Sequence, residues 1–227
     1  MSAVGMAMFS VMGGILGLDT VSFPQAMLSR PIVSATLGGA AMGAPAAGLL
    51  AGATLELYAL ETLPFGASRY PEWGSSSAVG GALFAMQSPG TTGALILSVT
   101  MTLALAYVGG WSMVQLRRLN ASWARRRHEA VARGSRRVVI GLQLYGLTAD
   151  LLRGIALTAL GLAVGIPAQR AVLDTLQGNA ALSRAVVVAA ATSVALGAVW
   201  KIFHAVPHAR WLFAVGLAIG VGLAVSR

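Results

Sequence analysis

The sequence predicts an all-α membrane protein, a polytopic helical bundle whose first half contains broken or re-entrant helices. Of its 227 residues, 56% are hydrophobic and 10% are charged, whereas a soluble domain is roughly a quarter charged. Mean hydropathy is +0.75. Several uncharged stretches reach the roughly 17 to 25 residues that a transmembrane helix needs. The chain has no cysteine, which excludes disulfides, thiolate metal sites and cysteine nucleophiles.

The first expected membrane segment is Met1 to Leu18, which lacks the basic start of a signal peptide and so predicts no cleaved leader. The next uncharged stretch, Pro31 to Leu55, is interrupted by proline and glycine. Because freed backbone groups cannot face lipid, these breakers predict helices packed inside protein. Trp73 to Ser88 is too short for a full crossing and precedes Pro89, which predicts a re-entrant hairpin.

The elements that follow are more regular. Thr91 to Leu116 is long enough to span a membrane, and Gln115 to Arg133 interleaves apolar residues with arginines. This second pattern predicts an amphipathic helix at the membrane interface. Three further helices are expected at Val138 to Ile166, Ala185 to Phe203 and Trp211 to Ser226. The chain therefore divides into an irregular membrane half (1–116), an Arg-rich connector (117–137) and a half of regular transmembrane helices (138–227).

The connector carries most of the positive charge. Between Arg117 and Arg137, eight arginines face Glu129 alone, a net +7 of the chain's +9. The positive-inside rule places such a segment in the cytoplasm, beside anionic lipid headgroups. No nucleic-acid-reading motif accompanies the arginines, so we expect no nucleic acid partner. A docking surface for a soluble partner is the other interpretation, and the two are compatible.

Pairs of glycines four residues apart occur along the chain and are typical of close helix contacts in lipid. They predict an oligomer, and the alternative is that a chain with 28 glycines contains such pairs by chance. The pairs are Gly13 and Gly17, Gly39 and Gly43, Gly48 and Gly52, Gly161 and Gly165, and Gly216 and Gly220.

Four of the seven acidic residues, Asp19, Glu56, Glu61 and Glu72, lie in or beside the broken first half. Ionisable groups at membrane depth are costly and tend to mark a functional site, while the alternative for each is an interfacial charge at a helix end. Together with the amide of Gln25 and nearby aromatic residues, they could bind a polyhydroxylated solute. No catalytic triad, phosphate loop or metal-ligand spacing is present, and His204 and His208 have no carboxylate nearby.

In the second half, Asp150 and Arg153 stand at i, i+3 within an apolar helix. This spacing puts them on one face, so we expect a structural ion pair or a link to the first half rather than a catalytic pair.

The region from Gly13 to Gly81 combines several features in a fixed order. Asp19 follows the first span, Gln25 precedes the pair Arg30-Pro31, and glycines are spaced through the next span. Then come a Gly-x-x-Leu-Glu box from Gly52 to Glu56, a Gly66-Ala67 pair and a Pro71-Glu72 pair. In these features the chain resembles component IIC of the mannose/sorbose family of the bacterial phosphoenolpyruvate-dependent sugar phosphotransferase system.

The resemblance implies a multi-pass permease of the inner membrane that binds a hexose-type sugar of the mannose, sorbose or N-acetylgalactosamine class. In that family component C pairs with a membrane component D, and components A and B carry the phosphoryl group. The resemblance assigns sugar binding to Asp19, Gln25 and Glu56, with Gly66 shaping the adjacent loop, and implies no cofactor and no phosphoryl chemistry on this chain. The alternative is a diverged, non-transporting scaffold or receptor that recruits a soluble partner through its Arg-rich loop.

Overall fold

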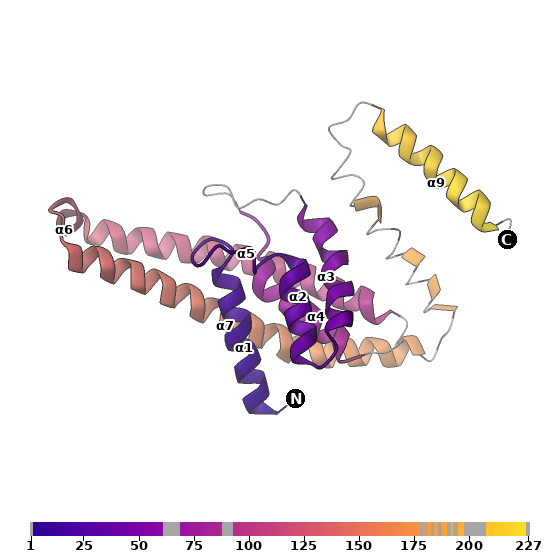
Figure 1. Cartoon of the computed structure of the whole chain (residues 1–227), viewed down its shortest axis with the longest axis horizontal. Coiled ribbons are helices and arrows are strands. Elements are labelled where there is room, and N and C mark those ends of the chain that lie inside the picture. Colours follow the sequence, from indigo (N-terminus) through magenta and orange to yellow (C-terminus); the bar gives the residue numbers. More distant parts are fainter. Residues whose placement is uncertain are drawn as a thin grey trace.

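The computed structural model describes residues 2–60, 69–87, 93–177 and 208–225, together with runs of one to three residues between 179 and 197. Within these ranges every regular element is an α-helix (Figure 1). The all-α prediction is therefore confirmed. Two long helices, α5 and α7, run side by side as an arm, and four shorter helices pack around one end of this pair.

The first half is built from short helices, as the breakers predict. They are α1 (Ala3–Leu18), α2 (Pro31–Ala41), α3 (Pro45–Ala59) and α4 (Trp73–Ala85). Prolines begin α2 and α3, where the missing backbone N–H costs nothing. Gly43, with φ +82°, makes the reversal between these two helices.

Helix α4 lies at the centre of the bundle. At 13 residues, about 20 Å, it is too short to cross a bilayer. Its Val79 and Leu83 pack with Leu16 of α1 and Leu162 of α7, while its Trp73 packs with Leu55 of α3. Nearly every residue of α4 is buried, so this helix is the core around which the others assemble.

Close approach of these helices depends on glycine. A Cβ at Gly38 of α2 or at Gly81 of α4 would overlap the backbone oxygen of Ala78 or Ala35 on the facing helix. A Cβ at Gly13 of α1 would overlap the Thr158 side chain on α7. Most of the glycine pairs found in the sequence thus serve crossings within this chain, whereas a Cβ at Gly216 or Gly220 would meet no atom of the described residues within 4 Å.

The arm consists of α5 (Ala94–Arg126), α6 (His128–Ala132) and α7 (Arg136–Gln177). By length and composition, α5 and α7 could each cross a membrane. The sequence predicted an amphipathic helix at the membrane interface from Gln115 to Arg133. In the structure this segment is the end of α5, which continues to Arg126 without a proline or glycine, followed by α6.

The predicted end of α7 at Ile166 is wrong. Pro167 directly follows that predicted end, yet it lies inside α7, which continues for ten more residues to Gln177. Beyond the proline, Leu173 and Leu176 are buried, and Gln169 donates to Ser98 Oγ of α5 at 2.9 Å. Packing against α5 offsets the helical hydrogen bond that the proline cannot form.

The last described helix is α9 (Ala209–Val225), close to the predicted Trp211 to Ser226. Most of the predicted helix from Ala185 to Phe203 lies outside the described residues, as do Glu61, Gly66 and His204.

Candidate sugar site in the first half

Asp19 follows α1 and organises the loop that leads to α2. The residue is 2% exposed. One carboxylate oxygen accepts from the backbone N–H of Ala26 at 2.6 Å, and the other accepts from the N–H of Ser29 at 2.8 Å. Both oxygens are thus occupied by the chain itself. Because hydrogen bonds to a carboxylate are strong, Asp19 fixes the shape of the 20–30 loop.

Glu56 lies near the end of α3 and faces the start of α2. It accepts from the Arg30 guanidinium in a close ion pair, and its second oxygen accepts from the backbone N–H of Ile32 at 3.1 Å. The side chains of Arg30 and Glu56 are 31% and 17% exposed. Unlike Asp19, this pair is therefore accessible from outside the bundle.

Gln25 lies in the loop between these two carboxylates. Its backbone has φ 59°, its side chain is exposed, and its amide donates to the Val21 carbonyl at 2.9 Å. Asp19 holds one end of this loop, and Arg30, bound to Glu56, closes the other. The structure therefore connects Asp19, Gln25 and Glu56 through one loop.

Arg30 is the site residue that the sequence interpretation missed. It was noted only as half of an Arg-Pro pair, yet the first 116 residues contain just two basic residues, Arg30 and Arg69. A membrane-embedded acid is expected to have a partner, and the shortage of cations was the signal that could have identified Arg30.

Glu72 lies at a helix end, but it is buried inside the bundle rather than exposed at the membrane interface. It caps α4, accepting from the Ser75 N–H at 3.1 Å, and it is 1% exposed. The side chain of Ser75 in turn donates to the Gly13 carbonyl of α1 at 2.9 Å. Glu72 thus satisfies the N-terminus of the central helix, as an acidic N-cap does.

A second network joins the 20–30 loop to the arm. Arg153 donates to Asp150 Oδ1 at 2.9 Å, so the two residues form the pair that their spacing predicts. Ser22 donates to the other oxygen of Asp150 at 2.6 Å. Arg153 also donates to Ser112 Oγ of α5 at 3.2 Å. The loop that carries Gln25 is consequently tied to both long helices.

Among the described residues, no group of three or more His, Asp or Glu side chains could hold a metal ion. Among the described residues of the first half, the polar groups of the site are carboxylates, an amide and a guanidinium, which can bind a ligand by hydrogen bonds.

The profile of the family described as PTS system sorbose-specific IIC component matches residues 1–199. No curated protein matches the chain significantly. Among solved structures, a chain from the cryo-EM structure of the mannose transporter ManYZ in complex with microcin E492 matches with a TM-score of 0.63 and 18% identity. The match covers 97% of this chain and 87% of that one, and it supports the same fold. The resemblance identified in residues 13–81 is confirmed over a much longer range, and the chain belongs to the sorbose-specific IIC component family of the phosphotransferase system.

Proposed function

We propose that this chain is a sugar-binding and translocating permease subunit, selective for a hexose-type sugar of the mannose, sorbose or N-acetylgalactosamine class. The observation that carries the proposal is the accessible Arg30–Glu56 pair at the end of a loop held by a buried carboxylate. Sugar hydroxyls both donate and accept hydrogen bonds, so they can bind to a carboxylate and a guanidinium together.

The three proposed sugar-site residues have different tasks. Glu56 accepts hydrogen bonds from sugar hydroxyls, and Gln25 offers an exposed amide on the adjoining loop. Asp19 contributes to binding by holding that loop, since it is buried and its oxygens bind backbone N–H groups of the loop. Gly66 stays a proposed part of the site by resemblance alone.

We further propose that the chain works in the inner membrane as a multi-pass subunit, paired with a component D, while components A and B phosphorylate the sugar. The support is family membership and the fold shared with a chain of the ManYZ transporter structure. Two described helices have the length and composition to cross the membrane.

Substitution of Glu56 by Gln tests the proposal. Glutamine keeps the shape and one acceptor but removes charge-assisted bonds, each contributing about 1.5 to 3 kcal/mol. Mannose or sorbose affinity should fall at least about tenfold in purified protein, measured by calorimetry, because about 1.4 kcal/mol is a factor of ten.

The matched control is Glu129→Gln, an exposed glutamate in α6. It should leave affinity unchanged. If Glu56→Gln lowers the melting temperature but leaves affinity within about twofold, the pair has a structural role only. A wild-type chain that binds no hexose, alone or with its membrane partner, would favour the scaffold alternative.

A further inference from the structure

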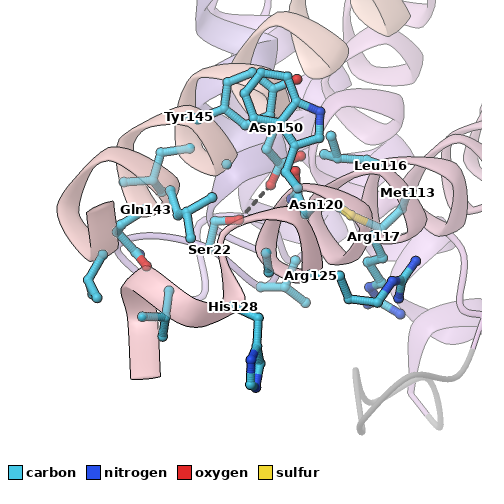
Figure 2. Close-up of a pocket in the computed structure, with 18 residues that line it drawn as sticks. Ser22, Met113, Leu116, Arg117, Asn120, Arg125, His128, Gln143, Tyr145 and Asp150 are labelled. Atoms are coloured by element: carbon cyan, nitrogen blue, oxygen red, sulfur yellow. Dashed lines mark hydrogen bonds between the residues drawn. The ribbon is translucent and has the colours of Figure 1, made fainter. Parts of the chain in front are cut away.

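We propose that a cavity within the arm, between α5 and α7 from the 20–30 loop to α6, binds one anionic phospholipid, with its headgroup at Arg125 and Asn120 and an acyl chain along the apolar wall. The cavity measures about 740 Å³ and lies between α5, α6, α7 and the loop residues Val21 and Ser22. Figure 2 draws the residues around it, with the hydrogen bond from Ser22 to Asp150 dashed. This site is separate from the Arg30–Glu56 pair, so the inference does not depend on sugar transport.

The charge of the cavity suits an anion. Its described lining includes Arg117 and Arg125 together with His128. The acidic residue in the lining, Asp150, has both oxygens engaged, one by Arg153 and one by Ser22. Arg117 also donates to the Tyr70 hydroxyl and stacks over its ring at 4.9 Å. The two arginines outnumber the single carboxylate of the lining, and the contacts with Tyr70 hold Arg117 in place.

A buried acceptor in the lining calls for a hydrogen-bond donor on the ligand. The Oδ1 atom of Asn120 is buried and makes no hydrogen bond within the described residues. A buried polar atom without a partner is costly, and rotation of the Asn120 side chain towards the cavity would let a headgroup hydroxyl satisfy it. Phosphatidylglycerol offers both a phosphate and the free hydroxyls of its glycerol headgroup. Inorganic phosphate has no alcohol hydroxyl to offer.

The rest of the wall is apolar and partly aromatic. Leu116, Leu142 and Leu147 line it, and the rings of Trp123 and Tyr145 stack across α5 and α7 with centroids 4.0 Å apart. A soluble anion gains nothing from such a wall, whereas an acyl chain buries apolar surface on it. The combination of cations, an unpaired acceptor and an apolar wall thus selects an amphipathic anion.

The position of the cavity's polar residues along α5 also fits a site for a lipid headgroup. About 20 helical residues cover a hydrocarbon core of about 30 Å, so a helix that enters at Ala94 leaves the core near Met113. Arg117, Asn120 and Arg125 follow within the next four turns of α5. Arginine and tryptophan side chains at this depth reach headgroups while their apolar parts contact the acyl region.

Native mass spectrometry of the full chain, alone or with any membrane subunit that copurifies, tests the inference. Titration with phosphatidylglycerol should yield one retained lipid per chain, at least about tenfold tighter than phosphatidylcholine. Arg125→Gln should weaken retention about tenfold through loss of a charge-assisted bond, and Asn120→Ala about fivefold through loss of a neutral one. Melting curves of each variant show that it is folded.

The matched control is Arg126→Gln, which removes the same charge from the neighbouring exposed residue outside the cavity. It should leave lipid retention unchanged. If Arg125→Gln and Arg126→Gln reduce lipid retention equally, the lipid is attracted to the whole basic surface rather than to the cavity, which would overturn the proposed site. Equal retention of phosphatidylcholine would overturn it too. Displacement of the lipid by inorganic phosphate at matching concentration would identify a free-anion site instead.

Discussion

Asp19 occupies both carboxylate oxygens with backbone N–H groups of the loop that it holds. We predict that Asp19→Asn loosens this loop, because a carboxamide has one acceptor oxygen where the carboxylate has two. The free energy of unfolding should fall by about 1 to 3 kcal/mol. Hydrogen exchange should accelerate at Ala26 and Ser29. The control is Asp174→Asn on an exposed face of α7, and equal exchange in both variants would contradict the role of Asp19.

Arg153 and Asp150 form a pair with side-chain exposures of 9% and 3%. Removing one partner of a buried pair leaves the other charge uncompensated, which costs about 3 to 5 kcal/mol. We therefore expect Arg153→Met to lower the melting temperature strongly. The double variant with Asp150→Asn should recover part of that loss. Additive losses in a double-mutant cycle would show that the two side chains do not stabilise each other.

At the scale of elements, glycines set how closely α2 and α4 approach. Gly81→Ala places a methyl group against the Ala35 backbone oxygen, which cannot move as a flexible side chain could. Overpacking of this kind costs about 1 to 3 kcal/mol. Gly141→Ala is the matched control, because a Cβ at Gly141 of α7 would meet no atom of a neighbouring described element within 4 Å. Thermal unfolding should show a loss in the first variant and none in the second.

The elements also show where local patterns stop being informative. The starts of α2 and α3 at Pro31 and Pro45 follow from the fixed φ of proline. Helix α7 does not end at Pro167, because burial of Leu173 and Leu176 and the hydrogen bond from Gln169 to Ser98 of α5 stabilise the helix beyond it. A sequence pattern over a few residues carries no information about the neighbouring helix, and packing against that helix decides where α7 ends.

At the scale of the whole molecule, the arm holds the Arg-rich connector (117–137) at one end and the C-terminal end of α7 at the other. The helix has 42 residues, about 63 Å, more than twice the hydrocarbon thickness. The eight arginines favour a cytoplasmic position for the connector. We predict that a cysteine at Ser135 is labelled only from the cytoplasmic side and one at Thr175 only from the periplasmic side.

The absence of cysteine in the natural chain gives a clean background for this labelling. Labelling of both positions from one side would mean that α7 does not cross the membrane. Labelling with the sides exchanged would place the Arg-rich turn in the periplasm and overturn the orientation.

The sequence by itself determined the class of protein, the broken first half, the charged turn and the family, because hydropathy, breakers and charge runs are local properties. It also indicated Asp19 and Glu56 as unusual acids. Only the tertiary structure decided what those acids do: Asp19 holds a loop, Glu56 pairs with Arg30, and Glu72 caps the central helix. Their hydrogen-bond partners depend on which backbone groups and side chains the fold brings within about 3 Å, and no periodicity in the sequence records that distance.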